Sequence, residues 1–351
     1  MSVLHVEADF AILDEQLYYN NIFEKIGRKI RPELYEINSK FMPDSQFEAI
    51  KKRGISKEKR KRCEKSEDAT WIEQIASGVR KVGKEMGYFK ESSNQDNNLN
   101  ARQAAEKALS VITPSTNKLL CNGIISNWIK CSQEKPGVVE NGESQKIFIP
   151  PGATFHVGDV ADVEQYSAIN DILFDLVVAD PPWFNKSVKR KKTYEMNEQV
   201  IDNLDITSIT TNDALIVFWI TNRKWVEEEM KERFKSWNME VIATWKWLKI
   251  TTQGEPVYDL DKEKHKLPYE SIVFAKKRSS RREFNIYEKF VFASIPMAVH
   301  SHKPPLLELF QHFGIDFMQP LELFARSLLP STHSIGFEPF LLQSEHVFIP
   351  K

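Results

Sequence analysis

The stretch "FDLVVADPPW", residues 174–183, decides the interpretation of this chain. A mostly apolar run ends in Asp180, and two prolines and a tryptophan follow. A short, nearly continuous apolar run is typical of a strand that is buried on both faces of a sheet. Because prolines fix φ and carry no N–H group, the pair predicts a stiff turn directly after that strand.

Similar apolar runs recur beyond residue 150, with helical or polar segments between several of them. They are "ATFHV", "ALIVFWI", "EVIATWKWL", "SIVFA", "KFVFASI" and "LELFA". Residues 225–234 and 305–313 are typical of crossover helices, and Gly314 is placed to end the second. The alternation predicts an α/β domain over residues 149–351, with a mainly parallel, doubly wound sheet.

Residues 1–148 predict a mostly helical, partly disordered N-terminal extension. We expect helices near 14–26, 69–86 and 101–112, whereas "ESSNQDNNLN", residues 91–100, has the composition of a disordered loop. The basic run "KKRGISKEKRKR", residues 51–62, is compatible with a nuclear address, an RNA contact or a solvated helix face. The extension is therefore interpreted as an RNA-binding or targeting segment.

Composition excludes several classes of protein. The net charge is −1, so any binding of nucleic acid must depend on local positive charge. The three cysteines lack CxxC spacing, and His300 and His302 lack a third ligand, so neither disulfides nor a metal site is predicted. No apolar stretch reaches the ~20 residues of a membrane helix, and the start has no signal-peptide pattern. We expect an intracellular, reduced protein.

Polar side chains follow several of the expected strands. In a doubly wound sheet, ligands bind beyond the carboxyl ends of the strands. This rule selects Asp159, Asp180, residues 221–223 and Arg326, which we expect on one rim. Asn222 and Arg223 either reach a substrate or cap the following helix.

The residue types of Asp180 to Trp183 suit one kind of ligand. The carboxylate and the turn carbonyls accept hydrogen bonds, and Trp183 offers a face on which a base can stack. Together they predict a site that holds a flat group bearing an NH₂. The alternative is a chance transition from strand to turn.

Basic residues come directly after this turn. They are Lys186, Lys189, Arg190, Lys191 and Lys192. They favour a loop that contacts phosphates, and the alternative is a solvated surface loop. Trp245 and Trp247, which alternate in a strand-like run, either stack on bases or pack within the sheet.

The motif carries a resemblance to a known family. Asp-Pro-Pro-aromatic after a buried strand resembles the S-adenosylmethionine-dependent amino methyltransferases, and DPPW resembles the eukaryotic N6-adenosine methyltransferase family. "IPPGATFHVGDV", "NKSVKR", "LPYES", "HSHKPPLLELF" and "LELFAR" are similar to that family as well, over about residues 149–338. The resemblance implies a Rossmann-like fold, S-adenosyl-L-methionine as cofactor and the N6 amine of adenine as acceptor.

The resemblance also implies roles for individual residues. Asp180, Pro181, Pro182 and Trp183 would hold the amine, with Asp180 also close to the methionine end of the cofactor. The residues implied in binding the cofactor's adenine, carboxylate and ribose are Asp159, Val160, Lys303, Glu322, Phe324 and Arg326. Those implied in binding substrate are Asn185, Lys186, Ser187, Lys189, Arg190 and Glu270.

One residue departs from the family pattern. "SIGFE" places Phe337 where the family has an asparagine that bonds the ribose of the cofactor. A phenyl ring cannot make that hydrogen bond. Either the local alignment differs, or the cofactor binds more weakly, or Arg326 and other residues hold the ribose.

The expected reaction is direct transfer of methyl to the amine, without a metal and with Asp180 as a hydrogen-bond acceptor rather than a strong base. The resemblance implies 2′-O-methyladenosine in spliceosomal small nuclear RNA as substrate, giving N6,2′-O-dimethyladenosine. Adenine in DNA is the alternative substrate. A non-catalytic RNA-binding scaffold is the alternative of another class. We expect a monomer, without a membrane or an obligate protein partner, located in the nucleus and also compatible with the cytoplasm.

Overall fold

The structure is a computed structural model. It describes residues 2–42, 67–91, 97–110, 128–131, 134–140, 146–183, 201, 204–260, 266–299 and 302–351. The basic run at 51–62 and the basic loop after Trp183 lie outside these residues.

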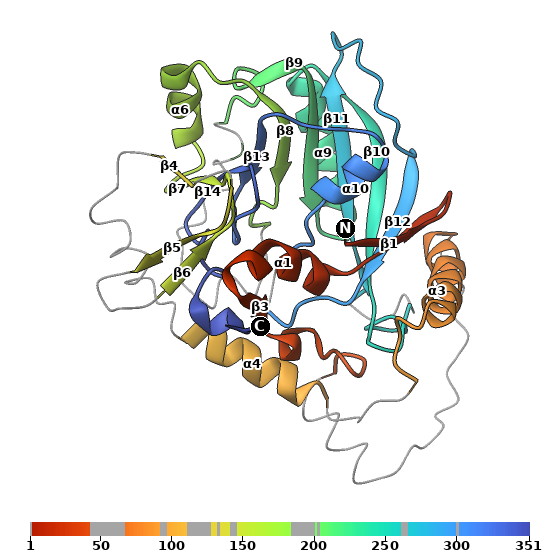
Figure 1. The fold of residues 1–351 in the computed structure, drawn as a ribbon. Helices are drawn as coiled ribbons and strands as arrows, with labels where there is room; N and C mark the ends of the chain where they lie inside the picture. The colour runs from red at the N-terminus through yellow and green to blue at the C-terminus, as the bar shows by residue number, and fades with distance from the viewer. Residues whose placement is uncertain are drawn as a thin grey trace.

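The described residues form strands with helices between several of them (Figure 1). The strands are β1 (Val3–Val6), β2 (Phe10–Leu13), β3 (Arg28–Ile30), β4 (Ile129–Lys130), β5 (Gly137–Glu140), β6 (Lys146–Ile149), β7 (Thr154–Val157), β8 (Phe174–Ala179), β9 (Thr210–Ile220), β10 (Met239–Lys249), β11 (Tyr269–Lys277), β12 (Lys289–Ser294), β13 (Pro320–Leu323), β14 (His333–Gly336) and β15 (Phe348–Pro350). The helices are α1 (Glu15–Phe23), α3 (Glu67–Glu85), α4 (Leu99–Ser110), α6 (Asp162–Asn170), α9 (Lys224–Ser236) and α10 (Leu307–His312), with 3-10 turns η1 (Glu24–Ile26), η2 (Pro32–Tyr35) and η3 (Glu345–Val347).

One large sheet organises the molecule, in the order β1-β2-β12-β10-β11-β9-β8-β13-β14-β7-β4. Within this described sheet, only β1, β4 and β11 run against the direction of the other strands. The predicted α/β class with a mainly parallel sheet is confirmed, and each apolar run quoted above lies in a strand. The strands that share a direction end at one edge, which we call the rim.

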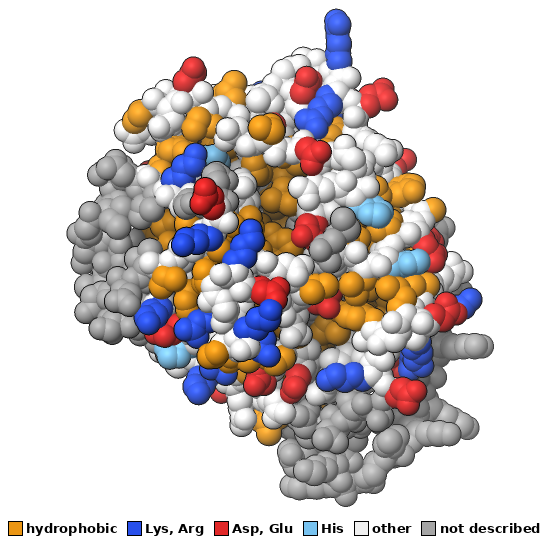
Figure 2. Space-filling view, in the orientation of Figure 1, with side chains coloured by type: hydrophobic (Ala, Val, Ile, Leu, Met, Phe, Trp, Pro, Cys, Tyr) orange, Lys and Arg blue, Asp and Glu red, His pale blue; other side chains and the backbone are white. Residues whose placement is uncertain are grey.

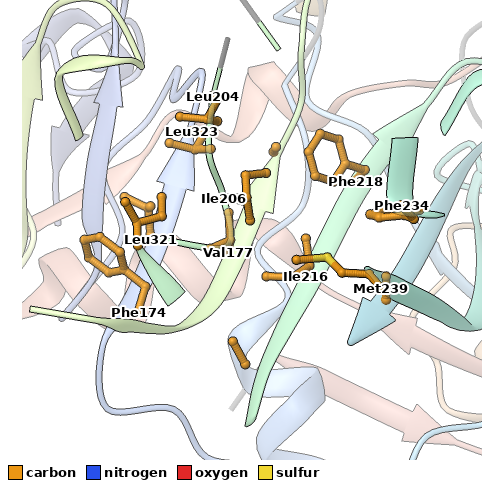
Figure 3. Close-up of a cluster of buried hydrophobic side chains, with 14 of the residues drawn as sticks. Phe174, Val177, Leu204, Ile206, Ile216, Phe218, Phe234, Met239, Leu321 and Leu323 are labelled. Atoms are coloured by element: carbon orange, nitrogen blue, oxygen red, sulfur yellow. The ribbon is translucent and has the colours of Figure 1, made fainter. Parts of the chain in front are cut away.

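Helices cover both faces of the sheet because successive strand residues alternate between two cores. In β8, Val177 and Ala179 face a core that includes residues of α6 and α9, whereas Leu176 faces a core that includes α10. Figure 3 shows the first core, with Phe174, Val177 and Leu321 from the strands and Phe234 from α9. The crossover helices predicted at 225–234 and 305–313 are confirmed as α9 and α10, and Gly314 takes a φ of 73° after the second.

The prediction that the N-terminal extension is mostly helical is wrong. β2 pairs in parallel with β12, and β1 pairs with β2, so the start of the chain extends the large sheet. The three expected helices do form, as α1, α3 and α4. Figure 1 shows α1, α4 and the C-terminus gathered at one end of the molecule, and a shared hydrophobic core joins them. The boundary at residues 148/149 stays a prediction.

The surface carries charges of both signs, as Figure 2 shows for one face, where Lys and Arg alternate with Asp and Glu. No helix in the described ranges combines the length and the apolar character needed to span a membrane.

Candidate active site

Asp180 and the other strand-end candidates lie along the rim. Asp180 follows β8, Asp159 follows β7, and Thr221 follows β9. Because β9, β8, β13, β14 and β7 are consecutive neighbours with a common direction, their carboxyl ends meet at one edge. The structure therefore brings these residues to one rim, as expected from the sequence.

The Asp180 carboxylate is held by two cations. Arg326 donates from Nη1 to Oδ2 of Asp180 at 2.6 Å, and Nζ of Lys303 lies 3.5 Å from the same oxygen. The Asp180 side chain is only 18% exposed, so these contacts are poorly screened by solvent. The carboxylate is thus fixed in place at the start of the double-proline turn.

Lys303 continues this contact to a second carboxylate. Its Nζ donates to Oε2 of Glu270 at 2.7 Å, while Lys249 donates to Oε1 of the same side chain. Burial raises the pKa of Glu270, but the Lys303 and Lys249 ammonium groups outweigh it and lower the pKa to about 2. Burial lowers the pKa of Lys303, and the charges of Asp180 and Glu270 reverse this and raise it. We call Arg326, Asp180, Lys303, Glu270 and Lys249 the charge chain.

Lys249 is a member of the charge chain that sequence reasoning missed. It is the last residue of β10, and the pairing of Trp247 with Glu270 in β11 places the two charges side by side. Its Nζ also lies 4.5 Å from the centre of the Trp247 ring. A lysine at the carboxyl end of a strand was the available signal, because the rim rule applies to β10 as it does to β8.

Glu322, in β13, lies close enough to Asp180 and Arg326 for their charges to act on it. Its Oε2 is buried and has no hydrogen-bond partner among the described residues. Burial, and then the Asp180 charge, raise the pKa of Glu322 to about 8, although Arg326 acts in the opposite direction. With Lys303 and Trp219 it lines a cavity of about 40 Å³. Its carboxyl group is therefore predominantly neutral at pH 7.

Trp183 is fixed by its own contacts. Its Nε1 donates to the backbone oxygen of Trp219 at 3.0 Å, and its ring packs partly against the core beneath β8 and β9. The double-proline turn therefore ends in an indole whose orientation is determined by the neighbouring strand. The ring is only half-buried, so part of its face remains available to a ligand.

The far end of the rim carries the residues implied in binding the adenine of a cofactor. Asp159 is exposed, and its Oδ1 accepts a hydrogen bond from the backbone N–H of Ala161 at 3.0 Å. Val160 is buried in the core, so its side chain faces away from the rim. Phe324, which the resemblance implies in binding the ribose, follows β13 next to β8 and has a φ of 60°, which is uncommon for a residue with a side chain.

Other candidates have structural partners. Trp245 and Trp247 are both fully buried, which confirms packing as their role in the sheet. Asn222 donates to the backbone oxygen of Tyr269 and accepts from Ser271 at 3.3 Å, so it joins β9 to β11. Nε2 of His302 lies 3.3 Å from Oε2 of Glu15. The described residues include no group of three or more His, Cys, Asp or Glu side chains placed to hold a metal ion.

The substrate loop lies outside the described residues. This concerns Asn185, Lys186, Ser187, Lys189 and Arg190. Of the residues implied in binding substrate, the structure places Glu270 alone, and it places it within the charge chain.

Comparison with known proteins shows which proteins this chain is similar to. The MT-A70 family model matches residues 174–338. A Caenorhabditis elegans protein named DNA N6-methyl methyltransferase is 60% identical over 98% of this chain and 98% of its own length. The mouse N(6)-adenine-specific methyltransferase METTL4 is 36% identical, and the match covers 60% of this chain and 49% of that protein. N6-methyladenosine RNA methyltransferase MTA1 of Cryphonectria parasitica is 31% identical over 68% of the chain and 75% of its own length.

Proposed function

This chain belongs to the MT-A70 family, and we propose that it transfers a methyl group to the N6 amine of adenine in DNA. The observation that carries the choice of DNA is the similarity, along nearly the whole chain, to a protein named DNA N6-methyl methyltransferase. The double-proline turn with its fixed Asp180 supports the chemistry, because it presents acceptors to an amine.

The proposed cofactor is S-adenosylmethionine, which supplies an electrophilic methyl group on its sulfonium. The residues at the rim fit this molecule. Lys303 offers an ammonium for its carboxylate, Asp180 a negative charge beside its sulfonium, and Asp159 an acceptor for its adenine amine. The buried and unpartnered Oγ1 of Thr221 adds a polar atom at the same edge, in the described part of the chain.

Asp180 and the turn have a positioning task in the reaction. Asp180 accepts a hydrogen bond from the adenine amine and orients the nitrogen lone pair toward the methyl group. A neutral aromatic amine is a very weak acid, so its proton leaves only after the new N–C bond has begun to form. Trp183 limits the movement of the base, and holding both reactants in line supplies much of the rate acceleration.

RNA is the second candidate substrate. The RNA methyltransferase MTA1 is among the relatives, and the resemblance described above implies 2′-O-methyladenosine of small nuclear RNA. The two substrates differ at the 2′ position of the ribose, where DNA has hydrogen and RNA has a hydroxyl or methoxy group. A binding surface that tolerates only hydrogen there would reject both forms of RNA.

The test compares three oligonucleotides of one sequence that contain deoxyadenosine, adenosine or 2′-O-methyladenosine at the target position. Each is incubated with the full chain and labelled S-adenosylmethionine. We expect the fastest transfer to deoxyadenosine. Faster transfer to either RNA form would replace the DNA assignment. No transfer to any of the three would favour the non-catalytic scaffold.

We also propose that the chain acts as a monomer in the nucleus, with the basic run at 51–62 as its address. One polypeptide supplies both the amine-binding turn and the charge chain, which supports activity without a second copy or a protein partner. Sedimentation of the purified protein tests whether it is a monomer. Fluorescence microscopy of the chain with and without residues 51–62 tests whether this run directs it to the nucleus.

A further inference from the structure

Phe337 is an apolar side chain in an unexpected place. It directly follows β14, and 51% of its surface is exposed. β14 lies between β13 and β7, and the N–H of Gly158 donates to the oxygen of Gly336 at 3.1 Å. Phe337 is therefore next to the segment that leads into Asp159, at the rim.

The backbone that carries Phe337 is tightly held. The N–H of Ala325 donates to the oxygen of Ile335 at 3.0 Å. A Cβ atom on Gly336 would lie 2.8 Å from the nitrogen of Ala325 and 2.9 Å from its oxygen, so only glycine allows β13 and β14 to approach this closely. Because the main chain is fixed on both sides, little backbone entropy is lost when a ligand contacts Phe337.

We propose that Phe337 provides an aromatic face on which the adenine ring of S-adenosylmethionine stacks, beside Asp159, which accepts a hydrogen bond from the adenine amino group. This inference rests on the proposed function. A purine ring gains binding free energy from stacking on an aromatic side chain, whichever polar contacts its ribose makes. Phe337 thus replaces one kind of contact with another, and the ribose is left to residues such as Arg326.

Exposure alone does not carry this inference, because single exposed apolar residues are common. Met318 is even more exposed, at 83%, but it precedes β13 and lies at the opposite edge of the sheet. Phe337 differs from it in its position, between the end of β13 and Asp159.

The test is isothermal titration calorimetry of the full chain with two ligands, S-adenosylmethionine and 5′-methylthioadenosine, which lacks the methionine carboxylate and amine. We expect Phe337→Ala to weaken binding of both by about tenfold, as loss of one stacking contact should. Phe337→Trp should bind both within about twofold of the unsubstituted chain. Met318→Ala, which removes an exposed apolar side chain from the other edge, should change neither.

The outcomes separate this inference from the proposed function. If the unsubstituted chain binds neither ligand at millimolar concentration, the proposed function itself fails. If it binds both and Phe337→Ala binds them equally well, the stacking assignment is overturned. Weaker binding of S-adenosylmethionine alone would overturn it too, because the contact would then lie at the methionine end.

Discussion

At the end of β8, an arginine and a lysine both lie within 3.5 Å of one oxygen of Asp180, whereas at the end of β14 an exposed phenyl ring follows the strand. The two places lie on the same rim, with only β13 between their strands. The first is poorly accessible to water and depends on charge. The second is half exposed to water and carries an aromatic ring. The comparison suggests that a ligand spanning the rim is oriented by charge at one end and by shape at the other.

This difference predicts that substitutions in the charge chain change both stability and binding, whereas substitutions at the Phe337 end change binding alone. Partly buried charges that lose a partner destabilise the folded state, because the remaining charge is left poorly solvated. Replacing an exposed side chain leaves no poorly solvated charge in the folded state.

Lys303→Met should have the largest effect. It leaves the Asp180 and Glu270 carboxylates without the cation between them, so we expect the free energy of unfolding to fall by about 3 kcal/mol. Binding of S-adenosylmethionine should weaken by about 100-fold because its carboxylate loses a charged partner. Urea denaturation and calorimetry measure the two quantities. Lys303→Arg is the matched control, and equal losses in both variants would show that charge is not the reason.

Glu322→Gln should alter how stability depends on pH. Burial holds the pKa of Glu322 at about 8 in the folded chain, above its ordinary value of 4.5, so the folded state binds more protons between these values. The unsubstituted chain should therefore lose stability as pH rises from about 4.5 to 8, by on the order of 4 kcal/mol. Glu322→Gln lacks this titration, and its urea midpoint should fall less. Parallel curves for the two proteins would contradict the assignment.

Asp159→Asn should have the smallest effect. Asparagine keeps the oxygen that accepts from Ala161, so the turn and the stability should be preserved. Binding of S-adenosylmethionine should weaken by roughly fivefold, as expected for loss of a charge-assisted hydrogen bond at an exposed position. Calorimetry measures the affinity, and a fall in melting temperature would show that Asp159 is structural as well.

Much of the rim was predictable from local sequence. The apolar run of β8 and the turn after it are encoded within ten consecutive residues, so Asp180 and Trp183 could be placed without knowledge of the rest. The parallel strands that carry Asp159 and Arg326 could be identified for the same reason.

What could not be predicted depends on contacts between distant segments. β1 and β2 have only four residues each, and β2 pairs with β12, which is distant in the sequence, so local patterns gave no strand prediction there. β14 has only four residues, two of them polar, and gave no strand signal. The contact between Lys249 and Glu270 depends on the register of β10 and β11. The burial of the Glu322 carboxyl group depends on the side chains that the fold packs around it.

The central claim is that Asp180 and its turn hold the adenine amine for methyl transfer. The most direct test is a single-turnover measurement of N6-methyldeoxyadenosine formed by the unsubstituted chain and by Asp180→Ala, with a DNA oligonucleotide and saturating S-adenosylmethionine. We predict product with the unsubstituted chain and a rate at least about 100-fold lower with Asp180→Ala, as loss of a preorganised polar contact to the reacting group requires. An equal rate in the two proteins would contradict the claim.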